Sequence, residues 1–147
     1  MRLIKDTNRK KILSLFLQQN GSPLFNAKGV AIGVFSGCFP FFGFQTLLGL
    51  FLARILKGNL FLAAIATWIS NPLTYVPLYY FNYKVGSILL KGSSNTIIER
   101  DLSLNALWQK GGIFSMRLIL GSSLVGLFLA MIFGAIVFFI YKIKKEK

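Results

Sequence analysis

The feature that most constrains this sequence is a charge-free stretch that is interrupted by prolines. Residues 58–83 contain no charged side chain. At about 1.5 Å per residue, a helix of that length crosses a hydrocarbon core of about 30 Å. The middle of the stretch, residues 70–77, holds Pro72 and Pro77 among serine, asparagine and threonine side chains. In hydrocarbon, a carbonyl without its helical donor costs several kcal/mol unless protein or trapped water satisfies it. Such interrupted helices occur in transporter binding sites and in kinked spans.

Two further windows, residues 29–53 and 118–141, also lack charged side chains. Hydrophobic residues make up 54% of the chain and charged residues only 14%, which is more apolar and less charged than a typical soluble domain. We therefore predict an all-α integral membrane protein with several passes. It combines broken helices, the first of them re-entrant, with one plain transmembrane helix over residues 118–141.

The chain carries 17 basic and 4 acidic residues, a net charge of +13. Basic residues gather on both sides of the apolar windows, in residues 2–11 and 142–147. This distribution is typical of the positive-inside rule and of attraction to anionic lipids. The expected partners are therefore the lipid bilayer and its anionic lipids, and nucleic acid is not expected.

The pattern divides the chain into four segments. Residues 1–21 are basic with apolar residues at helical spacing, which predicts an amphipathic helix at the membrane surface; a solvated tail is the alternative. Residues 22–91 form a core membrane domain with two interrupted helices. Residues 92–117 form a polar linker, and residues 118–147 form a transmembrane helix with a basic tail.

The first interrupted helix is expected between residues 23 and 56. Gly37, Pro40 and Gly43 disfavour a continuous helix in its middle, because proline lacks a backbone donor and glycine permits turn conformations. A fresh helix is expected from Phe44. Each half is too short to cross a bilayer alone, which favours a re-entrant hairpin over a kinked spanning helix.

The second interrupted helix is expected between residues 60 and 90, with its break at residues 70–77. Asn71 is placed to cap a helix whose first residue is Pro72, since its side-chain oxygen can accept from N–H groups two or three residues later. Pro77 would leave the carbonyl four residues earlier without its helical donor.

The chain offers few groups for catalysis. It contains no histidine and one cysteine, Cys38, and all four acids lie outside the apolar windows. General acid–base chemistry and metal binding both need such groups near the reacting atoms. We expect no enzyme, no catalytic residue, no metal site and no cofactor.

Paired interruptions indicate binding instead, since a helix that begins inside the membrane presents unpaired N–H groups and a partial positive charge to an anion. The expected function is the binding or transport of an anionic solute or a phosphate-bearing lipid, by a homo-oligomer. The predicted ligand-binding residues are Gln45, Thr46, Ser70, Asn71 and Thr74. The residues expected to break the helices are Pro40, Gly43, Pro72 and Pro77.

Several short patterns between residues 22 and 91 share one resemblance. In chain order they are Ser22-Pro23, residues 31–35, residues 39–43, Gln45-Thr46, Asn59, residues 67–74, Pro77, Tyr79-Tyr80 and Gly86. Together they resemble the bacterial membrane family catalogued as domain of unknown function 2062. The resemblance implies a bacterial inner-membrane location. Some members are fused to glycosyltransferase-like domains, which implies a glycosyltransferase-type partner by analogy.

The alternative function is a non-catalytic membrane scaffold that recruits an envelope or glycan-synthesis enzyme. Under this hypothesis the breaks are packing devices, and Asn71 only caps a buried helix.

The basic flanks predict a topology that can be tested. Residues 2–11 and 142–147 are both expected in the cytoplasm, which requires an even number of crossings. A re-entrant first element and two crossing helices satisfy this and place residues 92–117 outside. A reporter fused after Ser94 should therefore report an external location, and a cytoplasmic signal would contradict the topology.

Overall fold

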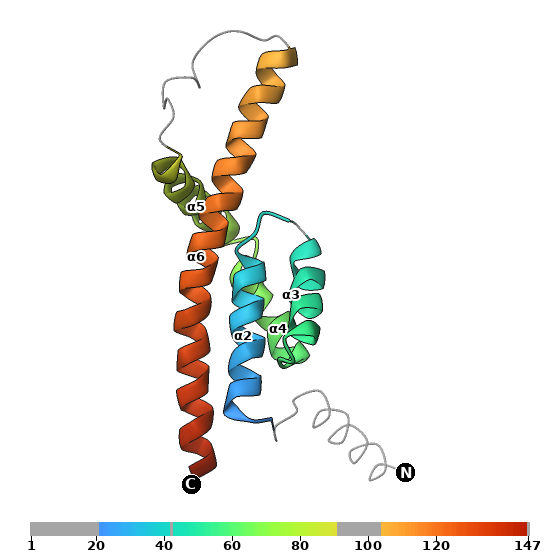
Figure 1. Ribbon diagram of the computed structural model, residues 1–147, viewed down its shortest axis with the longest axis vertical. Coiled ribbons are helices and arrows are strands. Elements are labelled where there is room, and N and C mark those ends of the chain that lie inside the picture. Colours follow the sequence, from blue (N-terminus) through green and yellow to red (C-terminus); the bar gives the residue numbers. More distant parts are fainter. Residues whose placement is uncertain (1–20, 42, 91–103, 147) are drawn as a thin grey trace.

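A computed structural model describes residues 21–41, 43–90 and 104–146, and in these ranges the chain is helical without strands (Figure 1). The elements are α2 (Pro23–Gly37), α3 (Phe44–Ile55), α4 (Leu60–Ala66), the 3-10 helix η1 (Thr67–Ile69), α5 (Tyr75–Leu89) and α6 (Leu104–Glu146). The basic segment expected at residues 1–21 lies outside the described residues apart from Gly21.

Helices α2 and α3 form a hairpin, as the first predicted break requires (Figure 1). Ser22 caps α2 by accepting a hydrogen bond from the N–H of Phe25 at 3.2 Å. Helix α2 ends at Gly37, and α3 begins after Gly43, whose φ of 80° lies in the region that favours glycine. The return of α3 along α2 brings the carbonyl of Leu56 within 3.4 Å of the Lys28 ammonium. The expected interruption is confirmed.

Helix α4 runs parallel to α2 in very close contact. A Cβ atom added to Gly29 would lie 2.4 Å from the carbonyl oxygen of Asn59. A Cβ at Gly33 would lie 2.2 Å from the Ala63 carbonyl oxygen, and one at Gly37 would lie 2.7 Å from that of Thr67. Small residues at such spacing let helix backbones approach closely. The sequence suggested Gly37 as a helix breaker, but all three glycines lie within α2 and form its contact surface.

The second break is shorter than predicted. Helix α4 and η1 cover residues 60–69 as expected, but the break ends at Thr74 and α5 begins at Tyr75. Pro77 therefore does not belong to the break. It lies in the first turn of α5, where its missing N–H has no intrahelical acceptor to lose.

Helix α6 begins earlier than the sequence predicts. Residues 104–117, which were expected in the polar linker, are part of this helix. Gly121 faces α5, where an added Cβ would lie 1.7 Å from the carbonyl oxygen of Asn82. A Cβ added to Gly126 would lie 3.1 Å from Cys38 Cβ, just after α2, and one added to Gly134 would lie 3.0 Å from Ala31 Cβ in α2. Small residues thus position α6 against both neighbours.

The described part of the chain buries polar side chains together with mostly small apolar ones, and it exposes many large apolar side chains. Its largest fully buried side chains are Asn26, Asn59, Asn82, Thr67, Cys38, Ser36 and Ser122. Large hydrophobic side chains are strongly exposed, among them Trp68 at 71% and Leu73 at 86%. Exposure of so many large apolar side chains is unusual for a monomeric soluble domain. One helical segment of the described residues, Gly111–Lys144, is long and apolar enough to cross a membrane.

The α5–α6 contact can be tested with two equivalent substitutions in α6. Gly121→Ala places a methyl group against the Asn82 backbone, and this overpacking should lower the free energy of unfolding by about 1–3 kcal/mol. The higher helix propensity of alanine offsets about 1 kcal/mol of that loss. Gly112→Ala meets open space and should leave stability unchanged or slightly raised. The measurement is the thermal unfolding midpoint in detergent. Equal midpoints for the two variants would contradict this packing.

Candidate functional site

Asn82 in α5 satisfies the backbone at the first break. It is fully buried, and its amide nitrogen donates to the carbonyl of Cys38 at 2.9 Å and to Ser122 Oγ at 3.0 Å. Tyr79 donates its hydroxyl to the carbonyl of Phe39 at 3.1 Å. Carbonyls that lose their helical donors where α2 ends are thus satisfied from α5.

The second break is satisfied by its own residues. Asn71 Oδ1 accepts from the N–H groups of Leu73 at 2.9 Å and Thr74 at 3.1 Å. These are the capping hydrogen bonds predicted for Asn71 with Pro72 in the following position, although continuous helix starts only after Thr74. Thr74 Oγ1 donates to the carbonyl of Ile69 at 2.7 Å. Hydrogen bonds within the break thus satisfy several of its backbone groups.

Gln45 and Thr46 connect α3 to the same region. Gln45 Nε2 donates to the Ser70 carbonyl at 3.4 Å, and the hydroxyls of Thr46 and Thr67 lie 3.1 Å apart in a hydrogen bond. All five predicted ligand-binding residues thus lie around η1 and the second break. Gln45 Oε1 is buried without a donor among the described residues. Ligand binding by this group stays a prediction.

The N–H groups expected to face an anion donate within the protein. Those of Phe44 and Gln45 both donate to the carbonyl of Phe41 at 3.0 Å. The two N–H groups after Pro72 donate to Asn71, as described above. These four N–H groups therefore have partners within the protein, and anion binding at the two helix starts stays a prediction.

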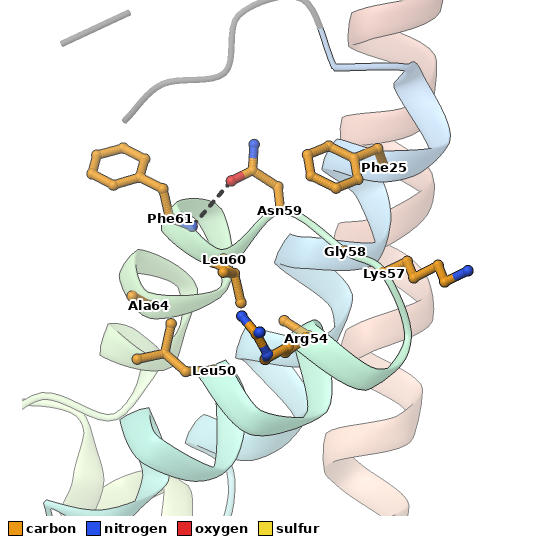
Figure 2. Close-up of a pocket in the computed structure, with 10 residues that line it drawn as sticks. Phe25, Leu50, Arg54, Lys57, Gly58, Asn59, Leu60, Phe61 and Ala64 are labelled. Carbon is orange, nitrogen blue, oxygen red and sulfur yellow. Dashed lines mark hydrogen bonds between the residues drawn. The ribbon is translucent and has the colours of Figure 1, made fainter. Parts of the chain in front are cut away.

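A cavity of about 490 Å³ lies at the other end of α3, beside the turn to α4. We call it the α3–α4 pocket (Figure 2). Its lining residues are Phe25, Leu50, Ala53, Arg54, Lys57, Gly58, Asn59, Leu60, Phe61 and Ala64. Figure 2 shows the Arg54 guanidinium beside Leu50 and Leu60, whereas Lys57 extends away from them. The pocket thus has mainly apolar walls, with the Arg54 guanidinium beside them and Lys57 at its edge.

Asn59 anchors this pocket to the start of α2. Its N–H donates to the carbonyl of Phe25 at 3.0 Å, and its side-chain nitrogen donates to Asn26 Oδ1 at 2.8 Å. Its side-chain oxygen caps α4 by accepting from Phe61 at 3.0 Å and Leu62 at 3.2 Å. Because one residue makes all these bonds, the turn between α3 and α4 has a defined position against α2.

Lys57 holds an unusual backbone conformation at the edge of the pocket. Helix α3 ends in a Schellman motif, in which the Gly58 N–H donates to the carbonyl of Ala53 at 2.8 Å. Lys57 occupies the left-handed position of this motif with φ 53°, and it is the only non-glycine residue with positive φ in the described ranges. Glycine is the usual residue there, and a side chain costs about 1 kcal/mol or more.

Basic residues outnumber acidic ones at this end of the molecule in the described ranges. The pocket lining contains no acid, and Glu146 is the only acidic residue in the described ranges. In Figure 1 the α3–α4 turn lies toward the same end of the molecule as the C-terminal end of α6, which extends beyond the turn. We call this the basic end, with Lys28, Arg54, Lys57, Lys142 and Lys144. Arg54 lies in the last turn of α3, where the helix dipole favours a cation. Its position can therefore be explained by helix stability alone.

Comparison with known proteins identifies the family. A family described as uncharacterized protein conserved in bacteria (DUF2062) has a sequence model that matches residues 8–147. The chain belongs to this family. The match extends well beyond residues 22–91, where the resemblance was expected. No curated protein and no solved structure matches the chain.

Sequence reasoning missed three of the residues that organise the structure. Asn26, Asn59 and Asn82 lie in or beside apolar segments, and each is fully buried in a contact between helices. The signal was available, because a polar side chain in an apolar helix is costly unless a neighbouring helix supplies a partner. The spacing of Gly29, Gly33 and Gly37 was a second signal.

Asn82 provides a test of how the first break is stabilised. Asn82→Leu leaves the carbonyl of Cys38 buried without its donor, which should cost about 1–3 kcal/mol. Ser123→Ala is the control, because the Ser123 hydroxyl donates to Ile119 within its own helix. Thermal unfolding in detergent should show a lowered midpoint for Asn82→Leu only. A midpoint equal to that of the control would exclude this role of Asn82.

Proposed function

We propose that the protein is a multi-pass protein of the bacterial inner membrane that binds an anionic solute or a phosphate-bearing lipid. The observation that carries the proposal is the α3–α4 pocket, in which Arg54 lies beside apolar walls, Lys57 lies at the edge, and none of the ten lining residues is an acid. Such a site suits a ligand with a negative group and an apolar part.

The distribution of side chains supports placement in a membrane. Exposed hydrophobic side chains cover the helices, while asparagine, serine and threonine lie inside. Helix α6 crosses the bilayer in this proposal, and α4 with η1 and α5 forms a second, interrupted crossing. Helices α2 and α3, with 15 and 12 residues, reach only about 22 and 18 Å, which suits a re-entrant hairpin.

The orientation follows from the basic end. Lysine and arginine side chains near membrane segments are enriched on the cytoplasmic side. The hairpin then enters from the cytoplasm, and the α3–α4 pocket lies at the cytoplasmic interface, near the headgroups of anionic lipids.

We propose binding without catalysis. The ten pocket residues include no carboxylate, imidazole, thiol or hydroxyl group. General acid–base or nucleophilic catalysis most often uses one of these groups. A role for Gln45, Ser70 and Asn71 in guiding a solute past the second break remains part of the proposal, with the buried oxygen of Gln45 as the available acceptor.

A second candidate function is a scaffold that recruits an envelope or glycan-synthesis enzyme. The internal hydrogen bonds of both breaks favour it, because they leave the breaks as packing elements. Crosslinking in membranes followed by purification would then return one enzyme partner consistently.

The binding proposal predicts selective retention of anionic lipid. The purified protein, mixed with equal amounts of phosphatidylglycerol and phosphatidylcholine in mild detergent, should retain mainly the anionic lipid in native mass spectrometry. The double variant Arg54→Gln/Lys57→Gln should lose most of this retention, since hydrogen bonds to charged groups contribute about 1.5–3 kcal/mol each.

The matched control is Lys142→Gln/Lys144→Gln, which removes two exposed cations from the same basic end but not from the pocket. It should retain anionic lipid as the wild type does. Equal losses in both double variants would mean that only the general positive charge matters, and no retention by the wild type would exclude the binding role.

A further inference from the structure

The charge of the α3–α4 pocket restricts the class of anion that it suits. Two cations, Arg54 and Lys57, line the pocket, and the lining contains no acid. A third cation, Lys28, lies nearby with its ammonium on the carbonyl of Leu56, at the end of α3. A phosphodiester carries one negative charge, whereas a phosphomonoester carries about −1.5 to −2 near neutral pH. Two unneutralised cations match the phosphomonoester better.

The walls of the pocket argue for an alkyl chain on that phosphate. Leu50 and Ala53 lie on one face of α3, and Leu60 and Ala64 lie on one face of α4, so apolar side chains extend about one helical turn from the cations. A cavity of about 490 Å³ is within the usual range for sites of ligand size, and it is far larger than inorganic phosphate requires. A free phosphate ion would leave most of the apolar part of the cavity empty.

The position of Lys57 separates ligand binding from stability. At the left-handed position of the Schellman motif, glycine would relieve backbone strain, and no ion pair with Lys57 occurs among the described residues. Arg54, by contrast, is also favoured by the dipole of α3. Replacement of Lys57 by glycine should therefore raise the stability of the fold and weaken ligand binding, so the two effects can be measured separately at this residue.

We propose that the α3–α4 pocket binds the head of a phosphomonoester lipid, with the phosphate at Arg54 and Lys57 and an alkyl chain against Leu50, Leu60 and Ala64. The inference rests on the binding role proposed above and names its ligand class. Arginine can hold two phosphate oxygens at once. The Lys57 side chain extends away from Arg54 in Figure 2, and in this proposal it turns toward the phosphate when the lipid binds.

Calorimetric titration of the full chain in detergent with short-chain probes tests this inference. The probes are dioctanoyl phosphatidic acid, dioctanoyl phosphatidylglycerol, dioctanoyl phosphatidylcholine, dioctanoylglycerol and glycerol 3-phosphate. Phosphatidic acid should bind at least about tenfold more tightly than every other probe, because only it combines two negative charges with alkyl chains. Its affinity should rise between pH 5.5 and 8, as the second phosphate proton is lost, whereas that of phosphatidylglycerol should stay constant.

The variant Lys57→Gly supplies a second readout. It should raise the thermal unfolding midpoint, because strain is removed, and weaken phosphatidic acid binding about tenfold. Lys142→Gln/Lys144→Gln should change neither quantity. A Lys57→Gly protein that is stabilised and binds phosphatidic acid as the wild type does would overturn the inference.

The remaining outcomes distinguish this inference from the function on which it rests. Equal binding of phosphatidic acid and phosphatidylglycerol, both above phosphatidylcholine, overturns the phosphomonoester inference but leaves an anionic lipid site. Binding of glycerol 3-phosphate as tight as that of phosphatidic acid overturns the lipid part and identifies a soluble phosphate ester as the ligand. If no anionic probe binds, both the inference and the proposed function are excluded.

Discussion

The parallel contact between α2 and α4 is the interaction on which the rest of the structure depends. Glycines on α2 let the α4 backbone approach so closely that no side chain fits between them, and Asn59 bonds the start of α4 to Phe25 and Asn26. Because α3 connects these two helices, its position follows from theirs. The α3–α4 turn is thereby held against the start of α2, and the pocket with Arg54 and Lys57 forms at that place.

The polar side chains of the apolar segments have a common task, which is to satisfy backbone groups where helices end. Asn82 and Asn71 do this at the two breaks, and Asn59 does it at the start of α4. In an apolar environment each such hydrogen bond satisfies a backbone group that would otherwise lack a partner, which would cost considerable free energy. The breaks are therefore compatible with stable packing, and the pocket cations Arg54 and Lys57 lie elsewhere, at the basic end.

Much of the helix pattern could be predicted, and the errors have local causes. Gly43 and Pro40 correctly indicated the end of the first helical half, since their backbone preferences act without tertiary contacts. Pro77 was wrongly included in the second break, because proline in a first helical turn is indistinguishable by composition from proline in a loop. The five predicted ligand-binding residues do gather around η1. The pocket was missed because it forms only where α3 and α4 fold back on each other and pack against Phe25 of α2.

By itself the sequence determined that the chain is helical and apolar with interrupted helices, because composition, charge-free windows and proline positions act locally along the chain. The direction of the chain after each break was decided only by tertiary structure. The first break reverses the chain and the second does not, although both contain a proline after an apolar half-helix. The reason is that Asn82 and the glycine contacts come from residues far away in sequence, and only their packing selects one arrangement.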